Sequence, residues 1–436
     1  MRAARVIGVG VAALATLASS HARAAAGAAF AETSRVASLA DAVTARPGDA
    51  GTIELNPAGL GDLREASVLA GGHADYVSQW FQRTGDPTQQ DRSRAFGGVF
   101  IAAATPLPGP AWARRIGVGL SLDMPVQYLL HLDIPVRADQ PISPTYDSRP
   151  DRLAGAFAIG AKVVRWLDFG AGFAFTPSLV EPALITYQAG RAPDVNGNVE
   201  VRIDTTLDTG VSPFVGLRAK PLDWLAFSLV YREAQISRAT GTQTTTAAGI
   251  TAAGPFNFYQ MWDPATVVVG TAMTLSRHVS FSLDVSWEQW SAIHDGFDQP
   301  LPGPIQFHDT VNVASGVEIS LPKGVALRGG VAVEPSPMPE QTGETNYLGA
   351  NALTLALGAG IDFRRLARVP LAIDLHFRAR ADALESAVKD PSSLPDADGT
   401  LPGNQIDNMG YPSFRSQALL VQGGLTATLF IGGGRP

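Results

Sequence analysis

The chain has 436 residues, of which 45% are hydrophobic and 17% are charged, and its formal net charge is −7 at pH 7. A chain with this charge lacks the basic surface that binds nucleic acid, so we exclude nucleic acid as a partner. It contains no cysteine, which excludes disulfides and cysteine-ligated metals and suits export through an oxidising compartment, and we expect neither a metal nor a cofactor.

The N-terminus is typical of an export signal. Arg2 and Arg5 give a positive start, residues 6–18 form an apolar core, and small residues follow. The core spans about 13 residues, fewer than the roughly 20 that a membrane-spanning helix needs. We therefore predict three regions: a signal peptide over residues 1–25, a compact N-terminal segment over residues 26–65, and the main domain over residues 66–431.

Residues 279–290, VSFSLDVSWEQW, show the pattern on which the predicted fold depends. Hydrophobic residues such as Phe281 and Leu283 alternate with polar residues such as Ser282 and Asp284. Successive side chains of a β-strand point to opposite faces, so this segment has one apolar face and one polar face. The alternation recurs in about 14 segments, over residues 68–77, 96–104, 116–126, 153–163, 169–177, 199–217, 225–233, 266–275, 279–290, 311–321, 325–334, 353–363, 369–380 and 419–430.

The connections between these segments alternate in length. Those after odd-numbered strands are long and those after even-numbered strands are short, as in outer-membrane barrels. After the N-terminus no run is apolar for long enough to make a transmembrane helix, so a membrane-embedded chain would have to close into a barrel. We therefore predict an all-β fold, a transmembrane antiparallel β-barrel of about 14 strands. We expect it in the bacterial outer membrane as a monomer, in contact with membrane lipids and lipopolysaccharide.

Several stretches resemble the FadL/TodX family of outer-membrane transporters of long-chain fatty acids and aromatic hydrocarbons. They are the NPAGL sequence of residues 56–60, SLDVSWEQWS of residues 282–291, and residues 307–363 with their SPMP loop. The resemblance implies a small N-terminal hatch inside the barrel lumen. It also implies passive transport of a hydrophobic small molecule, with lateral exit beside a kinked strand. The chain departs from the pattern at its C-terminus, where no aromatic residue closes the last strand.

The hatch residues Asn56, Pro57, Ala58, Gly59 and Leu60 are the first candidate ligand-binding site. Asn tolerates unusual backbone angles and forms local hydrogen bonds, Pro fixes a turn, and Ala-Gly allows another backbone to approach closely. Such a turn could satisfy the polar backbone of a plug that has no core of its own. From the residues themselves a plain surface turn is the simpler interpretation, and the family resemblance favours the hatch.

A second candidate site is an aromatic cluster in the long connection over residues 238–263, which we expect to be an external loop. Its members are Phe256, Phe258, Tyr259, Met261 and Trp262. Exposed apolar groups of this kind could receive an apolar ligand first. The alternative is an aromatic girdle at the membrane interface. We expect Trp224, Trp287 and Trp290 to be girdle or wall residues.

Charged residues on the polar strand faces should point into the lumen. The simplest role for most of them is an internal network that ties the strands together. If the ligand is a fatty acid, its carboxylate needs a cation, and Arg328 and Arg378 are the candidates because Arg pairs with carboxylates in a bidentate manner. A neutral hydrocarbon would need neither residue.

Two other classes of function remain open at this point. His278 and Ser280 have a spacing used by outer-membrane phospholipases, but Ser280 lies on the predicted lumen face, so we expect no enzyme. The barrel could instead be an assembly or secretion partner for other surface proteins, or a general porin.

Overall fold

The computed structural model describes residues 33–127, 139–147, 153–176, 179–188, 198–207, 210–247, 250–294, 299, 301, 305–394 and 408–432. The predicted signal peptide lies outside these residues. Within the described chain, no helix is both long and apolar enough to cross a membrane.

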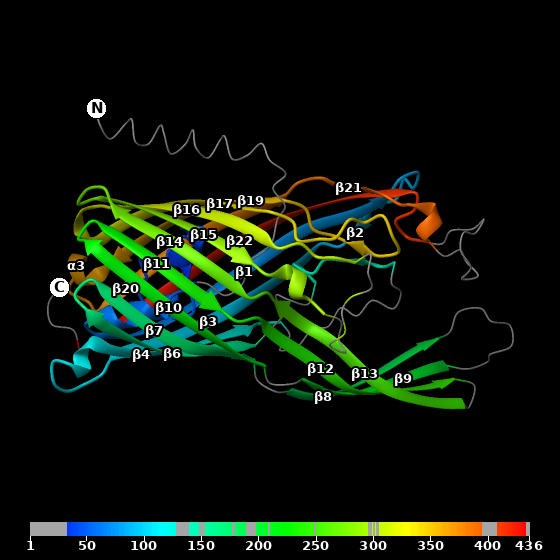
Figure 1. Ribbon diagram of the computed structural model, residues 1–436, viewed down its shortest axis with the longest axis horizontal. Coiled ribbons are helices and arrows are strands. Elements are labelled where there is room, and N and C mark those ends of the chain that lie inside the picture. Colours follow the sequence, from blue (N-terminus) through cyan, green and yellow to red (C-terminus); the bar gives the residue numbers. More distant parts are fainter. Residues whose placement is uncertain are drawn as a thin grey trace.

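Fourteen long antiparallel strands form the wall of a barrel (Figure 1). The sheet holds 16 strands. Two of them, β2 (Gln90–Asp91) and β21 (Glu385–Val388), are short and pair only with the ends of β1 and β22. The wall strands are β1 (Ala66–Arg83), β3 (Arg94–Pro106), β4 (Ile116–Pro125), β6 (Ala154–Val164), β7 (Leu167–Thr176), β10 (Gly210–Leu222), β11 (Leu225–Arg232), β14 (Thr266–Thr274), β15 (Val279–Glu288), β16 (Thr310–Ser320), β17 (Val325–Glu334), β19 (Ala352–Asp362), β20 (Leu371–Asp382) and β22 (Ser413–Ile431).

The first and last strands close the barrel. β1 pairs with β22 without interruption from Ala66 opposite Ile431 to Arg83 opposite Phe414. The ladder therefore has no open edge along the wall, and the backbone groups of the wall are hydrogen-bonded within the sheet. Only a closed sheet of this kind can be exposed to lipid, because lipid offers no hydrogen-bond partner to a free edge.

The short and long connections lie at opposite ends of the barrel, as predicted (Figure 1). We refer to these as the turn end and the loop end. The remaining elements lie in the connections and in the N-terminal segment: α2 (Ser34–Ala37), η1 (Ala50–Thr52), η2 (Pro57–Asp62), η3 (Ala113–Arg115), β5 (Pro141–Ile142), η4 (Trp290–Ala292), η5 (Pro322–Gly324), β18 (Asn346–Tyr347), α3 (Phe363–Leu366) and η6 (Pro391–Ser393).

A second sheet of four strands corrects two of the predictions. Its order is β13-β12-β9-β8, and it extends beyond the loop end (Figure 1). The predicted sixth strand, residues 199–217, is in fact two strands, β9 outside the barrel and β10 in its wall. The expected loop over residues 238–263 is a hairpin. The four strands are β8 (Leu179–Gln188), β9 (Asn198–Leu207), β12 (Gln235–Ala247) and β13 (Ile250–Asp263).

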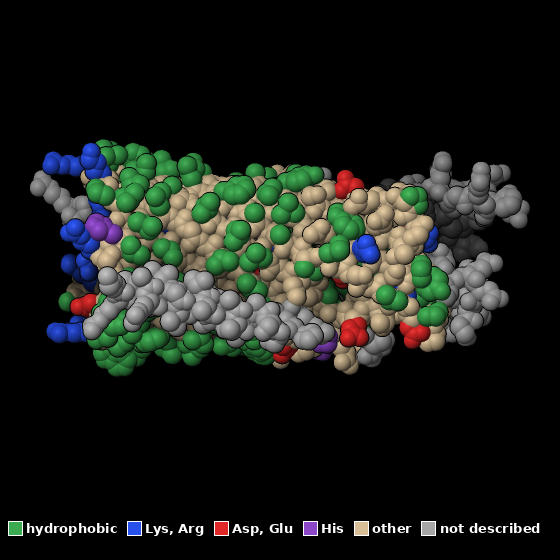
Figure 2. Space-filling view, turned by 90° about the horizontal axis from the view of Figure 1, so that it is seen from above, with side chains coloured by type: hydrophobic (Ala, Val, Ile, Leu, Met, Phe, Trp, Pro, Cys, Tyr) green, Lys and Arg blue, Asp and Glu red, His purple; other side chains and the backbone are tan. Residues whose placement is uncertain are grey.

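The barrel is apolar outside and polar inside. Along β20, Phe377 is 55% exposed whereas its neighbour Arg378 is 2% exposed, and along β19 Leu355 is exposed whereas Thr354 is fully buried. Hydrophobic side chains accordingly cover the flank of the barrel, and Lys and Arg gather at the turn end (Figure 2). A protein folded in water shows the opposite arrangement, so this surface is suited to lipid.

Tryptophans mark the turn end of this apolar surface. Trp112, Trp166 and Trp224 are all more than half exposed, and each lies in a short connection between two wall strands. Such side chains accumulate at membrane–water interfaces because one part of the ring is apolar and the other is polar. The exposed position of Trp224 thus agrees with its prediction as a girdle or wall residue.

Leu357 provides a test of the lipid-facing surface. It is exposed on β19, and we expect Leu357→Arg to lower the free energy of unfolding in lipid vesicles by about 2–4 kcal/mol, because the charge would enter the hydrocarbon. The measurement is urea unfolding followed by the gel mobility of the folded barrel. Val388→Arg is the control, since Val388 lies in β21 beyond the wall and its substitution should be nearly neutral. Equal effects of the two substitutions would contradict the assignment.

Candidate functional site

The N-terminal segment, residues 33–65, packs inside the barrel against the inner faces of the wall strands (Figure 1). Its apolar side chains Ile53 and Leu60 join the inward-facing Leu69, Phe100 and Phe214 in one buried cluster. This cluster packs the N-terminal segment against the wall.

Asn56 fixes the turn on which the segment depends. It is buried and caps η2, with its side-chain oxygen accepting a hydrogen bond from the backbone N–H of Ala58 at 3.0 Å. Its amide nitrogen donates to the carbonyls of Thr44, at 2.7 Å, and Leu217 of β10, at 3.4 Å. Pro57 occupies the first helical position, where its missing N–H costs nothing. The NPAGL turn is thus tied both to the segment itself and to the wall.

Four glycines of adjacent strands form the seat for this turn. Gly117, Gly160, Gly170 and Gly216 are paired across β4, β6, β7 and β10, so they make one row on the inner wall. A Cβ on any of them would overlap the turn: its backbone at the first three glycines and the Asn56 side chain at the fourth. The turn can approach the sheet this closely only because glycine has no side chain.

The other end of the segment lies against a different part of the wall. Leu39 and Ala40 contact Gly330 of β17 so closely that a Cβ there would overlap their backbone. Ala40 and Asp41 both have positive φ angles, 48° and 70°. For Ala40 this left-handed conformation costs about 1–3 kcal/mol, which the surrounding contacts must offset.

Ion pairs hold the segment to several strands. Arg46 lies 3.1 Å from Glu318 of β16, and Asp41 lies 2.7 Å from Arg378 of β20. Near η2, Asp62 pairs with Arg218 and Lys220 of β10. The segment is therefore held by charges on opposite sides of the barrel.

The two arginines predicted to contact a carboxylate already pair with carboxylates of the protein. Arg328 lies 2.7 Å from Glu318 and 2.5 Å from Asp374, whereas Arg378 pairs with Asp41 of the segment. Both are nine-tenths or more buried within the charged network that we expected for most lumen residues. A fatty-acid carboxylate would have to displace one of these partners.

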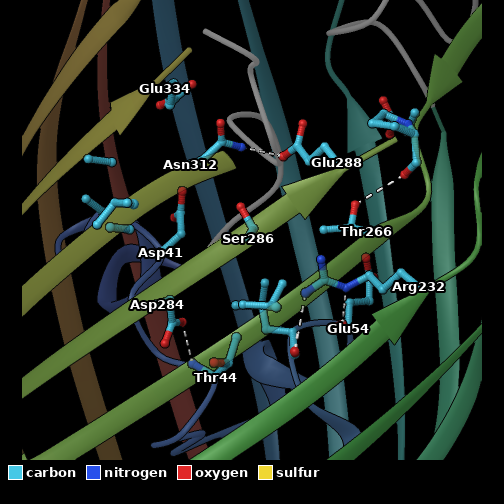
Figure 3. A pocket seen from close by; sticks show the side chains of 18 of the residues that line it. Asp41, Thr44, Glu54, Arg232, Thr266, Asp284, Ser286, Glu288, Asn312 and Glu334 are labelled. Atoms are coloured by element: carbon cyan, nitrogen blue, oxygen red, sulfur yellow. Dashed lines mark hydrogen bonds between the residues drawn. The ribbon is translucent and has the colours of Figure 1, made fainter. Parts of the chain in front are cut away.

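Two cavities lie on either side of the segment. The loop-side cavity, of about 190 Å³, lies between the segment and strands β11 and β14 to β17 (Figure 3). Polar side chains such as Glu54, Asp284 and Asn312 line it together with apolar Val268 and Ala314. The turn-side cavity, of about 410 Å³, is lined by the charged network around Glu318. The segment thus separates two spaces that lie along the barrel axis.

An aromatic cluster stands next to the loop-side cavity. Trp262, Trp290, Phe307 and Met338 are buried together, with the Trp262 and Trp290 ring centroids 5.6 Å apart. Trp290 donates a hydrogen bond of 2.9 Å from Nε1 to Glu288, which lines the cavity. Trp290, predicted to be a girdle or wall residue, is instead buried in η4 of the connection after β15.

Sequence reasoning placed only one member of this cluster among its site residues. Trp262 lies near the end of β13 and is a predicted ligand contact. Trp290 and Phe307 lie in the connection between β15 and β16, and Met338 lies in the connection after β17, so only the fold brings the four together. The remaining predicted residues, Phe256, Phe258, Tyr259 and Met261, also lie in β13, and their side chains fall outside the described part of the structure.

The loop end is covered by connections that are tied to one another. Tyr146 donates a hydrogen bond to Asp382 and accepts one of 2.6 Å from Arg380, and Asn346 donates to the Asp139 carbonyl at 2.6 Å. Lys389 donates to two backbone carbonyls of the 335–351 connection. Burial lowers the pKa of Lys389 to about 8. A ligand entering from this end must pass these tied loops.

The candidate phospholipase pair does not form a catalytic arrangement. His278 is exposed in the turn before β15, and its Nδ1 lies 2.9 Å from the carbonyl of Ser320. Ser280 is buried on the inner face of β15, as its place in the alternation predicted.

Comparisons with known proteins agree with this architecture. No protein-family model matches the chain. The crystal structure of a Pseudomonas aeruginosa FadL homologue aligns with a TM-score of 0.63 at 15% identity, covering 94% of this chain and 99% of that one. The Pseudomonas putida toluene transporter TodX aligns with a TM-score of 0.55 at 13% identity, covering 93% and 99%. The resemblance stated from the sequence is thus confirmed for the fold, which is that of the FadL/TodX barrels.

One curated protein is similar in sequence over a limited stretch. Alkane uptake protein A of Marinobacter nauticus is 31% identical over 129 residues, which make up 27% of this chain. The match spans 28% of that protein's length.

The glycine seat predicts the effect of a single methyl group. In Gly170→Ala the new Cβ would overlap the backbone of Pro57, so we expect the turn to move off the wall, at a cost of about 1–3 kcal/mol. The variant should conduct more ions in planar bilayers and expose the segment to protease. Gly423→Ala in β22 is the matched control, because its Cβ would meet its nearest atom at 3.9 Å. Unchanged conductance in Gly170→Ala would show that the seat does not hold the segment.

Proposed function

We propose that the protein is a passive outer-membrane channel for hydrophobic compounds, either long-chain fatty acids or hydrocarbons, in which residues 26–65 act as a hatch. The observation that supports this most is the N-terminal segment seated inside a lipid-suited barrel, with a cavity on each side of it. The fold shared with a FadL homologue and with a toluene transporter supports it further, as does the local similarity to an alkane uptake protein.

The proposed route follows the apolar and cavity-lining groups along the barrel axis. A hydrophobic molecule would be captured at the aromatic cluster of Trp262, Trp290, Phe307 and Met338. It would then enter the loop-side cavity, where the area removed from water supplies the affinity, about 25 cal/mol per Å². Movement of the hatch, including the NPAGL turn, would open the way onward. No step needs an energy source, since the compound moves down its concentration gradient.

The surroundings of the barrel follow from its surface. We propose that it lies in the bacterial outer membrane as a monomer, with membrane lipids and lipopolysaccharide against the apolar flank. A general porin requires a water-filled lumen, whereas a segment with its own buried cluster occupies this one, so the porin alternative is disfavoured.

An assembly or secretion partner is the second candidate, and one observation favours it. The four-stranded sheet extends beyond the loop end and has β8 and β13 as its outer strands. Outer strands can pair with another chain. Co-purification of a surface protein, lost when residues 179–207 are deleted, would support this function in place of transport.

Deletion of the gene should lower uptake. We expect cells without the protein to take up less labelled toluene-like compound, alkane or long-chain fatty acid, with restoration by the intact gene on a plasmid. The measurement is initial uptake rate in whole cells. If the rates for all three compounds are unchanged, the protein does not transport hydrophobic compounds in that host.

A disulfide can test whether the hatch moves. The hydroxyls of Thr44 in the segment and Ser228 in β11 lie 2.8 Å apart, and the chain has no cysteine to interfere. The Thr44→Cys/Ser228→Cys variant should therefore form one bond when oxidised and stop uptake, and a reducing agent should restore it. Thr44→Cys by itself is the control and should transport under both conditions. Full uptake through the oxidised double variant would exclude movement of the segment at this contact.

A further inference from the structure

The charges around the loop-side cavity are unevenly distributed. Seven carboxylates and one guanidinium are found among its described lining residues: Asp41, Glu54, Glu233, Asp263, Asp284, Glu288 and Glu334, with Arg232. Figure 3 shows several of them on neighbouring strands facing the same space. The cavity therefore has an acidic lining, although its proposed ligands include fatty acids.

Nearby cations pair with two of these carboxylates. Arg378 pairs with Asp41 at 2.7 Å, and Arg380 lies 3.2 Å from Glu334. Arg232 directs its guanidinium at the segment, donating from Nε to the Glu54 carbonyl at 2.9 Å. The positive charge that lines the cavity thus also fastens the segment to β11.

Asp284 and Glu288 both accept hydrogen bonds from neutral groups. Asp284 Oδ2 accepts from the backbone N–H of Thr44 at 2.9 Å. Glu288 accepts from Trp290 Nε1 at 2.9 Å and from Asn312 Nδ2 at 2.8 Å. Neutral donors satisfy carboxylate oxygens but supply no positive charge to hold an anion, so this side of the cavity suits a hydrogen-bond donor better than a carboxylate.

Two acceptors in the same wall bear on what the cavity can hold. Asp284 Oδ1 and Asn312 Oδ1 are buried and accept no hydrogen bond from the described residues, and both side chains are more than nine-tenths buried. Both residues line the loop-side cavity (Figure 3). A buried acceptor without a donor is unfavourable, and a ligand that brings a donor into the cavity would relieve it.

We propose that the loop-side cavity receives the polar end of an amphiphile that donates hydrogen bonds and carries no negative charge, an alcohol or a protonated amine, and that it rejects carboxylates. The hydrocarbon tail would lie against the aromatic cluster, which Glu288 joins to the cavity through Trp290. This inference rests on the proposed function and narrows its substrate class. An alcohol and an amine share the donor chemistry, and the charge of the amine distinguishes them.

Four ten-carbon probes test the selectivity. Binding of 1-decanol, decylammonium, decanoate and n-decane to the purified full-length protein is measured in a non-ionic detergent at pH 7. We expect decanol and decylammonium to bind at least about tenfold more tightly than decanoate. If only decylammonium binds more tightly than n-decane, the cavity recognises positive charge. If decanol also binds more tightly than n-decane, the cavity recognises hydrogen-bond donation. Decanoate binding as tightly as decanol would overturn the proposal.

A variant without the charges of Asp284 and Glu288 tests whether these two residues cause the selectivity against carboxylates. Asp284→Asn/Glu288→Gln keeps the shape of both side chains. The new amide oxygens can accept from the Thr44 N–H and from Trp290 Nε1. Asn312 can turn its own amide so that its oxygen accepts from the new NH2 group at position 288, and the variant should therefore fold like the parent barrel. We expect decanoate affinity to rise about tenfold and decylammonium affinity to fall by a similar factor. Asp223→Asn, in the exposed turn after β10, is the matched control and should change neither. If neither affinity changes in the double variant, the selectivity does not arise from Asp284 and Glu288, and the loop-side cavity is rejected as the binding site.

Uptake separates failure of this inference from failure of the proposed function. Equal uptake of decanol and decanoate by cells would leave transport standing and refute the selectivity. Uptake of decane, decanol and decanoate that does not depend on the gene would refute transport itself. Selective binding by the purified protein would in that case still support the cavity as a receptor site.

Discussion

The structure depends on one constraint, that a backbone in contact with lipid must satisfy its hydrogen bonds within the protein. The unbroken pairing of β1 with β22 meets this constraint for the wall. Closure then fixes the two faces: the outer one carries Leu and Phe, and the inner one receives the polar members of each strand. Polar side chains enclosed in this way need partners, and the N-terminal segment supplies many of them, such as Asp41 for Arg378.

Much of the fold could be predicted because strand alternation has a period of two and because lipid forces the apolar face outward. The wall strands and the separation of short and long connections follow from that pattern. The four-stranded sheet could not be recognised in the same way, because β9 and β10 both alternate and only the pairing partners distinguish them. A period of two identifies a strand without saying to which sheet it belongs.

Less of the candidate site could be predicted, because it is made by contacts between distant segments. The NPAGL sequence identified the turn, but the glycine row opposite it depends on register across β4, β6, β7 and β10, which a single sequence does not reveal. Arg328 and Arg378 lie on the inner faces of β17 and β20, where the alternation places them. Their carboxylate partners come from β16, β20 and the segment, so the arginines alone could not indicate whether their charge was balanced.

The two ends of the N-terminal segment lie against opposite arcs of the wall, one on β4 to β10 and the other on β16 to β20. The segment therefore spans the diameter of the barrel, and any flattening of the circular cross-section must stretch or bend it. The shape of the wall and the position of the N-terminal segment are mechanically coupled in consequence. Release of one end would leave the other as a pivot and would make the cylinder easier to deform.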